Sequence, residues 1–256
     1  MKSLVKRIAK SDFSILVRNS LRIKSVNLKP TNLNHPTTIS DAFLWRTDNG
    51  FKTKFKYSDI LNLFYGLKNS WVEIHFFTKN NIFLKKLKYS DLKISNEIEI
   101  TSDFFNGLID FGVFYIYHLT KDKIKNNNII SNRCYLGYSK DEQLYSFVHG
   151  NTLARYSAIN SSKNIYTNIV TTSLIQNQEY TIQKYFSGFE KNELFFSNPT
   201  NKTIKFSIGS KHYKLKAGET KNIDINEPLI TIKSNCLFLR PTVFSYKNNF
   251  YDVHHS

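Results

Sequence analysis

The sequence predicts an all-β protein of two tandem antiparallel β-sandwiches that follow a short N-terminal helix. Two observations lead to this prediction. The chain of 256 residues is rich in Phe (21) and Tyr (15) but holds few Gly (9) and Pro (5), and such enrichment is typical of strands. Short apolar segments also recur every roughly 8–12 residues with polar turns between them. The expected parts are a basic segment and linker (1–36), a first sandwich (37–155) and a second sandwich (156–256).

Residues 1–25 differ from the rest of the chain in their pattern. Leu4, Val5, Ile8 and Phe13 have helical spacing, with Lys and Arg between them. A basic amphipathic helix of this kind can lie on a membrane surface or bind a partner protein. The alternative, which we favour at this stage, is a terminal helix or strand packed on the body. No apolar run is long enough for a secretory signal or a transmembrane segment, so neither is expected.

The first element after the linker is a predicted hairpin. The apolar segment 42–47 and the segment 51–57 flank Asp48-Asn49-Gly50, and Asn-Gly is a strong turn signal because both residues tolerate positive φ. Along 51–57 the residues Phe, Thr, Phe and Tyr alternate with three lysines. One face is therefore buried and the other solvated, which indicates an antiparallel sheet.

The elements that follow continue the strand pattern. Segment 58–65 is the best candidate for a short helix, and 111–118 is apolar enough for a central strand. Further strands are expected at 72–77, 82–87 and 94–100.

The second half repeats the order of the first. Segments 133–151 and 240–256 each form a predicted hairpin that opens near an Arg and closes on Val-His. Upstream, 192–201 is similar to 72–81, and Ile-Asp-Ile at 223–225 is similar to Ile-Glu-Ile at 98–100. A shared order of elements predicts an internal duplication. The alternative is that any antiparallel sandwich gives a similar rhythm of apolar residues.

One segment of the second half has a familiar architecture. Residues 194–204 read as a strand, an Asn-Pro turn and a second strand, and a Gly-containing corner follows at 215–220. This order resembles immunoglobulin-like sandwiches; a jelly-roll-like arrangement is the other option. The resemblance covers some thirty residues and implies architecture alone.

The charge points to an anionic partner, with a competing explanation. The net charge is +16, which suits a nucleic acid, an acidic glycan or a membrane surface. Most of the basic residues are Lys, however, and a coding bias towards Lys, Asn and Ile gives the same excess without any binding role. Nucleic acid is not expected, because the alternation at 51–57 puts the rings and the lysines on opposite faces. The two cysteines, Cys134 and Cys236, suggest buried thiols in a cytoplasmic protein.

No sequence signature of an enzyme is present. The chain lacks a Gly-rich phosphate loop, a Gly-x-Ser-x-Gly elbow, a His-Glu-x-x-His motif and a Cys-x-x-Cys pair. The sequence therefore favours a non-catalytic binding or interaction module, with a glycan or acidic polymer as ligand. The candidate ligand-binding residues are Trp45, Arg46, Asp48, Asn49, Arg133 and Arg240. An indole can stack on a sugar ring and the polar groups can bind hydroxyls. The alternative role for the arginines is a buried Arg–Asp pair that holds hairpin ends together.

The second function that the sequence allows is a metal-dependent enzyme. His149, Asp252, His254 and His255 lie in the two Val-His endings and would converge if the units were related by a twofold axis. Imidazole and carboxylate groups suit a divalent metal such as Zn, Fe or Mn. A third option is a scaffold for a partner protein that binds residues 1–25.

Overall fold

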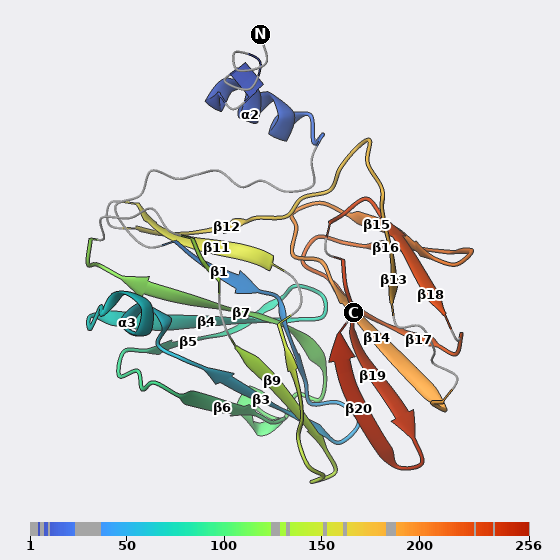
Figure 1. Ribbon diagram of the computed structural model, residues 1–256. Coiled ribbons are helices and arrows are strands. Elements are labelled where there is room, and N and C mark those ends of the chain that lie inside the picture. Colours follow the sequence, from blue (N-terminus) through green and yellow to red (C-terminus); the bar gives the residue numbers. More distant parts are fainter. Residues whose placement is uncertain are drawn as a thin grey trace.

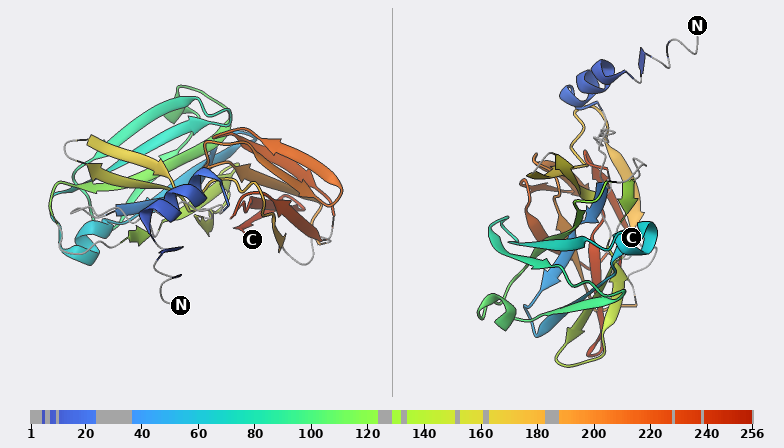
Figure 2. Two further views of the ribbon diagram at one scale, coloured as in Figure 1. Left: turned by 90° about the horizontal axis from the view of Figure 1, so that it is seen from above. Right: turned by 90° about the vertical axis from the view of Figure 1, so that its left-hand side faces the viewer.

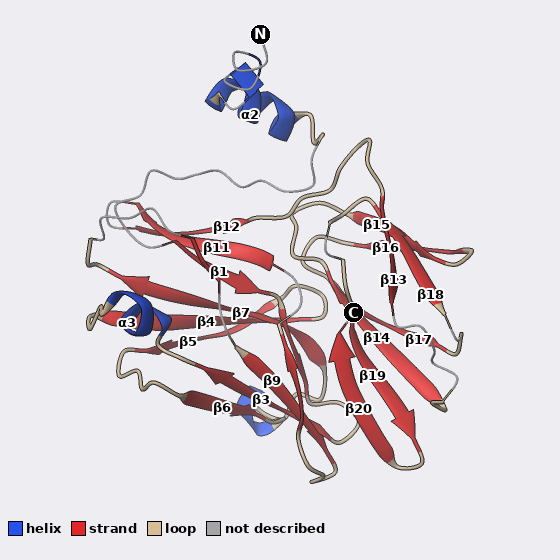
Figure 3. Ribbon diagram, in the orientation of Figure 1, coloured by secondary structure: helices blue, strands red, loops and turns tan. Residues whose placement is uncertain are grey.

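The protein is described by a computed structural model. The described residues are 5, 8–9, 11–23, 37–123, 129–131, 134–150, 153–160, 163–182, 188–227, 229–237 and 239–255. The prediction of an all-β fold is confirmed, since strands make up most of this part of the chain (Figure 3). Its two α-helices are short: α2 (Asp12–Ser20) and α3 (Ile60–Tyr65). Neither is long and apolar enough to cross a membrane.

Two sheets with a common core form the first unit (Figure 1). Sheet I has the order β2-β7-β4-β5 and sheet II the order β10-β9-β3-β6, and all their pairs are antiparallel. The strands are β2 (Phe43–Arg46), β3 (Phe51–Tyr57), β4 (Ser70–Thr78), β5 (Phe83–Tyr89), β6 (Asn96–Ile100), β7 (Phe111–Thr120), β9 (Tyr135–Lys140) and β10 (Ser146–His149). Aromatic rings from both sheets fill the core; Phe43, Phe55 and Phe114 are buried against one another.

A third sheet covers the outer face of sheet I. Sheet III has the order β12-β11-β1-β8 and includes one parallel pair, β1 with β8. Its strands are β1 (Thr37–Asp41), β8 (Ile129–Ser131), β11 (Leu153–Asn160) and β12 (Lys163–Asn168). Ala42 and Ala154 pack against Tyr115 and Tyr117 of sheet I. The boundary expected between residues 155 and 156 falls inside β11, which pairs with β1 over a long sequence separation.

The second unit has sheets IV and V. Sheet IV has the order β13-β18-β15-β16 and sheet V the order β17-β14-β19-β20, again with antiparallel pairs. The strands are β13 (Gln178–Ile182), β14 (Lys191–Ser197), β15 (Ile204–Ile208), β16 (Lys211–Leu215), β17 (Thr220–Ile225), β18 (Ile230–Ser234), β19 (Thr242–Lys247) and β20 (Phe250–His255). Aliphatic residues such as Ile204, Ile208 and Ile232 dominate the core between them.

The two units have the same strand topology. Numbered in chain order within each unit, strands 1-6-3-4 form one sheet (I or IV), and strands 8-7-2-5 form the other (II or V). The two Val-His hairpins, β9–β10 and β19–β20, occupy equivalent positions, as do β6 and β17. The segment 192–201 is the exception, because β14 occupies the position of β3 and not that of the strand at 70–78.

The turn at 48–50 forms, but it does not close a hairpin ladder. Asn49 and Gly50 both have positive φ, and Phe51 N donates to Asp48 O. The strands on either side belong to different sheets, because β2 pairs with β7 whereas β3 pairs with β6 and β9. The turn is therefore a corner between sheets I and II. The alternation predicted for 51–57 is confirmed, with Phe51, Phe55 and Tyr57 buried.

The N-terminal helix stands away from the sheets. In Figure 1 and in the right-hand view of Figure 2, α2 projects from the body, next to the chain that leads into the second unit. The end of the helical segment is tethered there, since Leu174 N donates to Arg22 O and Ser173 Oγ donates to Ile23 O. The remaining expectation for residues 1–36, a linker at 29–36, lies outside the described residues.

One side chain fixes the Asn-Pro turn that follows β14. The buried Asn198 amide donates to the carbonyl groups of Lys202, Leu215 and Lys216 at 2.7–3.0 Å, and its oxygen accepts from Thr200 N at 2.8 Å. Two loops of the second unit therefore depend on this one residue.

We expect Asn198→Ala to lower the free energy of unfolding by about 2–4 kcal/mol, because it leaves several buried carbonyl groups without a donor. Urea denaturation measures the loss. The matched control is Asn201→Ala in the same turn, where the side chain is exposed. Equal stabilities for the two variants would show that Asn198 does not hold the turn.

Candidate functional site

The segment that holds the candidate ligand-binding residues Trp45 and Arg46 is internal. Trp45 and Arg46 lie in β2 and both are fully buried. The Trp45 indole packs against Phe105 and its Nε1 donates to Phe77 O at 2.9 Å. The ring therefore belongs to the core and has no free face on which a sugar could stack.

Arg46 forms the buried Arg–Asp pair that the sequence offered as an alternative. Its Nε and Nη2 donate to the two carboxylate oxygens of Asp48 at 2.9 and 3.0 Å. Its Nη1 donates to Oε2 of Glu193 at 3.0 Å, and Glu193 also accepts from Tyr246 Oη at 2.6 Å. Because Glu193 belongs to β14 and Tyr246 to β19, the guanidinium connects the two units.

Aromatic rings enclose this guanidinium. Its Cζ lies 3.9 Å from the ring centre of Phe51, 4.6 Å from that of Phe244 and 4.8 Å from that of Phe195. Burial alone would lower the pKa of Arg46, but the hydrogen bond and charge of Asp48 and the charge of Glu193 outweigh it and raise the pKa. The arginine is thus held as a cation inside an aromatic cage.

The other candidate ligand-binding residues do not gather around this segment. Asp48 is partly exposed but engaged by Arg46, and Asn49 lies exposed at the tip of the turn. Arg240 is exposed in the second unit just before β19. Arg133 lies outside the described residues. The structure therefore brings Trp45, Arg46 and Asp48 together as an internal contact between units.

The two Val-His endings lie side by side. Strands β10 and β20 are neighbours, and Val253 N donates to Ser146 Oγ at 3.3 Å. Tyr251 Oη donates to Tyr138 O at 2.5 Å. These contacts close the interface between units next to the Arg46 cage.

The histidines of these endings do not form a ligand set. The rings of His149 and His255 approach to 6.5 Å between centres, whereas His254 Nε2 lies 3.3 Å from Ser245 Oγ. Burial lowers the pKa of His254 despite the nearby charge of Asp252. Across the described residues, no three His, Cys, Asp or Glu side chains are grouped closely enough to hold a metal ion.

The wet face of sheet II differs from its prediction. Strand β10 and the residue before it add aromatic rings to the face that carries the three lysines of β3. Lys54 Nζ lies 4.7 Å from the ring centre of Tyr145, and Lys56 Nζ lies 5.1 Å from that of Phe147 in β10. The rings of β3 itself lie on the opposite, buried face, as the alternation predicts. The lysine face nevertheless has aromatic rings, which come from other parts of the chain. Glu97, Glu99 and Glu142 lie within 4.0 Å of these lysines, so the face has little net charge to attract a polyanion.

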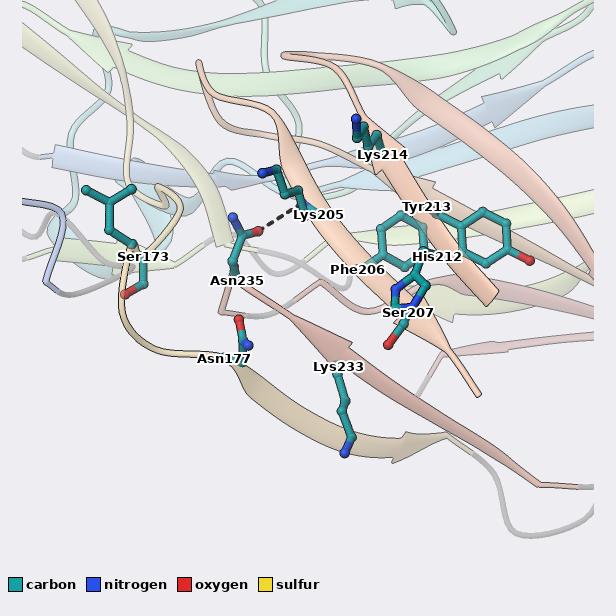
Figure 4. Close-up of a pocket in the computed structure, with 11 residues that line it drawn as sticks. Ser173, Asn177, Lys205, Phe206, Ser207, His212, Tyr213, Lys214, Lys233 and Asn235 are labelled. Carbon is teal, nitrogen blue, oxygen red and sulfur yellow. Dashed lines mark hydrogen bonds between the residues drawn. The ribbon is translucent and has the colours of Figure 1, made fainter. Parts of the chain in front are cut away.

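The feature that the sequence did not predict is a groove of about 580 Å³ on the second unit (Figure 4). Its lining side chains come from β15, β16 and β18 and from the loop before β13. The polar lining residues are Ser173, Asn177, Lys205, Ser207, His212, Lys214, Lys233 and Asn235, and the other lining residues are Leu174, Phe206 and Tyr213. None of the described residues that line the groove is acidic.

Strand register explains why the cations gather in the groove. Inward-facing Ile204, Phe206 and Ile208 alternate with Lys205 and Ser207 on the outer face of β15. Lys205 is paired directly with Lys214, and Ser207 lies between His212 and Lys233. Asn235 Oδ1 accepts from Lys205 N at 3.0 Å and fixes the end of the groove.

The direct Lys205–Lys214 pair is an unfavourable arrangement. Like charges opposite each other across two strands repel, and within the described structure neither ammonium group has a carboxylate within 4.0 Å. Lys233 differs, since its Nζ lies 3.1 Å from Oε2 of Glu179. The uncompensated charge of the groove therefore comes from Lys205 and Lys214.

A signal for this groove was present in the sequence. The lysines at 205 and 214 and the histidine at 212 alternate with apolar residues in two short strands separated by a Gly-containing turn, which would place them on one wet face. Lysine is so frequent in this chain that the pattern does not stand out from the rest of the sequence.

Comparisons with known proteins give no family assignment. No protein-family model matches the chain, and no curated protein matches it in sequence. The groove and the Arg46 cage are therefore interpreted from their own geometry.

We expect Arg46→Met to destabilise the protein by about 3–5 kcal/mol, because Glu193 and Asp48 would lose their buried cation. Chemical denaturation measures the change. Arg240→Met is the matched control at an exposed position, and it should leave stability nearly unchanged. A small effect at Arg46 would show that the units do not depend on the buried pair.

The pH dependence of stability should report Glu193. Burial alone would raise its pKa, but hydrogen bonds from Lys191 and Tyr246 and the charge of Arg46 lower the pKa below the ordinary 4.5. A lowered pKa in the folded state stabilises the protein above the unfolded-state value, and this contribution is lost as the pH falls through the folded-state value. Wild type should therefore exceed Glu193→Gln in stability at pH 7, with a difference that narrows below pH 4.5. A constant difference from pH 7 to pH 3 would argue against this role; Glu227→Gln, at an exposed carboxylate, is the control.

Proposed function

We propose that the protein is a non-catalytic binding module and that it holds an acidic glycan, or another anionic polymer, in the groove on sheet IV. The observation that carries this proposal is the unpaired, directly opposed Lys205 and Lys214 on the groove wall. An anionic ligand between them would offset a repulsion that the free protein bears. The net charge of +16 would assist the approach of such a ligand.

The rest of the groove suits a saccharide with acidic groups. Asn177 and Asn235 present amides that can donate to and accept from hydroxyl groups. The lining residues come from three neighbouring strands and the loop before β13, so the groove suits a chain that runs across the strands.

We further propose that each unit is a β-sandwich and that the two arose by duplication of one ancestral sandwich. The support is the identical order of eight strands in each unit, 1-6-3-4 and 8-7-2-5. A similar spacing of apolar residues that arose by chance would not by itself reproduce this strand order. The groove would then be a feature of one copy alone, since sheet I, the counterpart of sheet IV, is covered by sheet III.

A metal-dependent enzyme built on the Val-His endings is the alternative function. No contact among the described residues favours it over the binding module. A cytoplasmic location likewise stays a prediction, which rests on two cysteines that are buried and unbonded in the structure.

We expect Lys205→Gln/Lys214→Gln to weaken binding of polygalacturonate about tenfold or more, because two charge-assisted contacts are lost. Calorimetry with the full chain measures the affinity, and neutral dextran serves as the uncharged probe. The matched control, Lys121→Gln/Lys123→Gln, removes the same charge at exposed positions of the first unit.

The thermal stability of the groove variant separates function from folding. Removal of a like-charge pair should leave the melting temperature unchanged or raise it. Equal loss of affinity in both double variants would show that binding depends only on the net charge of the protein. That result would contradict the proposal that the groove is the binding site. Tight binding of inorganic polyphosphate with none of polygalacturonate would restrict the ligand to anionic polymers other than glycans.

A further inference from the structure

We infer that helix α2, together with the neighbouring turn at Leu174–Ile175, docks on an anionic lipid surface. This inference goes beyond the proposed function and does not depend on it. It starts from the exposure of large apolar side chains on α2: Phe13 is 75% exposed and Leu16 is 53% exposed. These two residues are three positions apart and lie on one face of the helix.

The exposed apolar surface continues beyond the helix. Leu21, directly after α2, is exposed, as are Leu174 and Ile175 in the facing turn. The two segments are joined, because Leu174 N donates to Arg22 O at 3.0 Å and Arg22 Nη1 donates to Thr172 Oγ1 at 3.1 Å. Two distant parts of the sequence therefore meet here, and both carry exposed aliphatic side chains.

The charge of the sequence that contains α2 identifies the occupant. Residues 1–25 contain a single acidic residue, Asp12, and seven basic residues: Lys2, Lys6, Arg7, Lys10, Arg18, Arg22 and Lys24. A helix with apolar residues on one face and cations around them is the pattern of interfacial helices, whose apolar side chains enter the headgroup boundary while the cations contact anionic lipids. A protein partner would need matching acids around an apolar groove, whereas an anionic bilayer supplies both features over its whole surface.

The position of α2 also favours a surface that covers it from outside. The helix projects away from the sheets (Figure 1), so its apolar face is not occupied by the described part of the body. Its N-terminal cap is complete, since Ser11 Oγ accepts from Ser14 N. The helix therefore has a defined start, and no packing on the sheets is needed to explain its apolar residues.

Vesicle flotation with the full chain tests this inference. Wild type should float with vesicles of phosphatidylcholine and phosphatidylglycerol, and added salt should release it. Phe13→Ser/Leu16→Ser should weaken this binding at least about tenfold. The matched control is Leu63→Ser/Phe64→Ser, which changes two exposed apolar residues of helix α3 and should float like wild type.

Three results would overturn the inference. Wild type that fails to float with the anionic vesicles excludes a lipid surface and leaves a protein partner as the occupant. Equal loss in the α2 and α3 variants would show that general surface hydrophobicity is responsible. Loss in Lys205→Gln/Lys214→Gln, with flotation kept in the α2 variant, would assign vesicle binding to the groove. Polygalacturonate binding by the α2 variant should match wild type, so the two proposals can fail independently.

Discussion

The arrangement of the two units depends on one buried guanidinium. Arg46 shares its hydrogen bonds between Asp48 of its own unit and Glu193 of the other, and three aromatic rings surround it. A lysine could not replace it, because a single ammonium group cannot meet two carboxylates in fixed, planar directions. The cost of burying these charges is offset only while both units are in place. The same region therefore selects one relative orientation of the units.

This interface determines which surfaces remain available for binding. The Val-His hairpins and the corner at 48–50 are used between units, and sheet III covers the outer face of sheet I. The two units also approach each other closely at the turn that contains Gly218, where a Cβ would lie 2.2 Å from the Asn81 side chain of the first unit. The groove on the outer face of sheet IV remains open, and no carboxylate of the described residues lies within ion-pair distance of Lys205 or Lys214. The proposed binding surface is thus on a face of the second unit that the contacts between units leave open.

The local pattern of the sequence predicted where the strands and turns lie better than it predicted which strands pair with one another. Alternation in 51–57 and the paired Val-His hairpins were correct because they depend on near neighbours. The corner at 48–50 was taken for a hairpin, since turn chemistry does not reveal that β2 pairs with the distant β7. The same limit explains the site. Trp45 and Arg46 are typical of exposed binding loops by composition, and only the contact with Glu193, some 147 residues away, shows that they are internal.

The pairing of β1 with β11 has a consequence for biosynthesis. Thr38 must wait for Ile130 of β8 to leave the ribosome before its strand finds a first partner, and for Ser157 of β11 before it finds the second. Arg46 must wait longer still for Glu193. Loop closure over such separations slows folding, and unpaired strand edges are exposed during the delay. While only the first unit has been synthesised, its exposed strand edges are therefore open to aggregation or to binding by a chaperone. Its maturation is complete only when the second unit emerges.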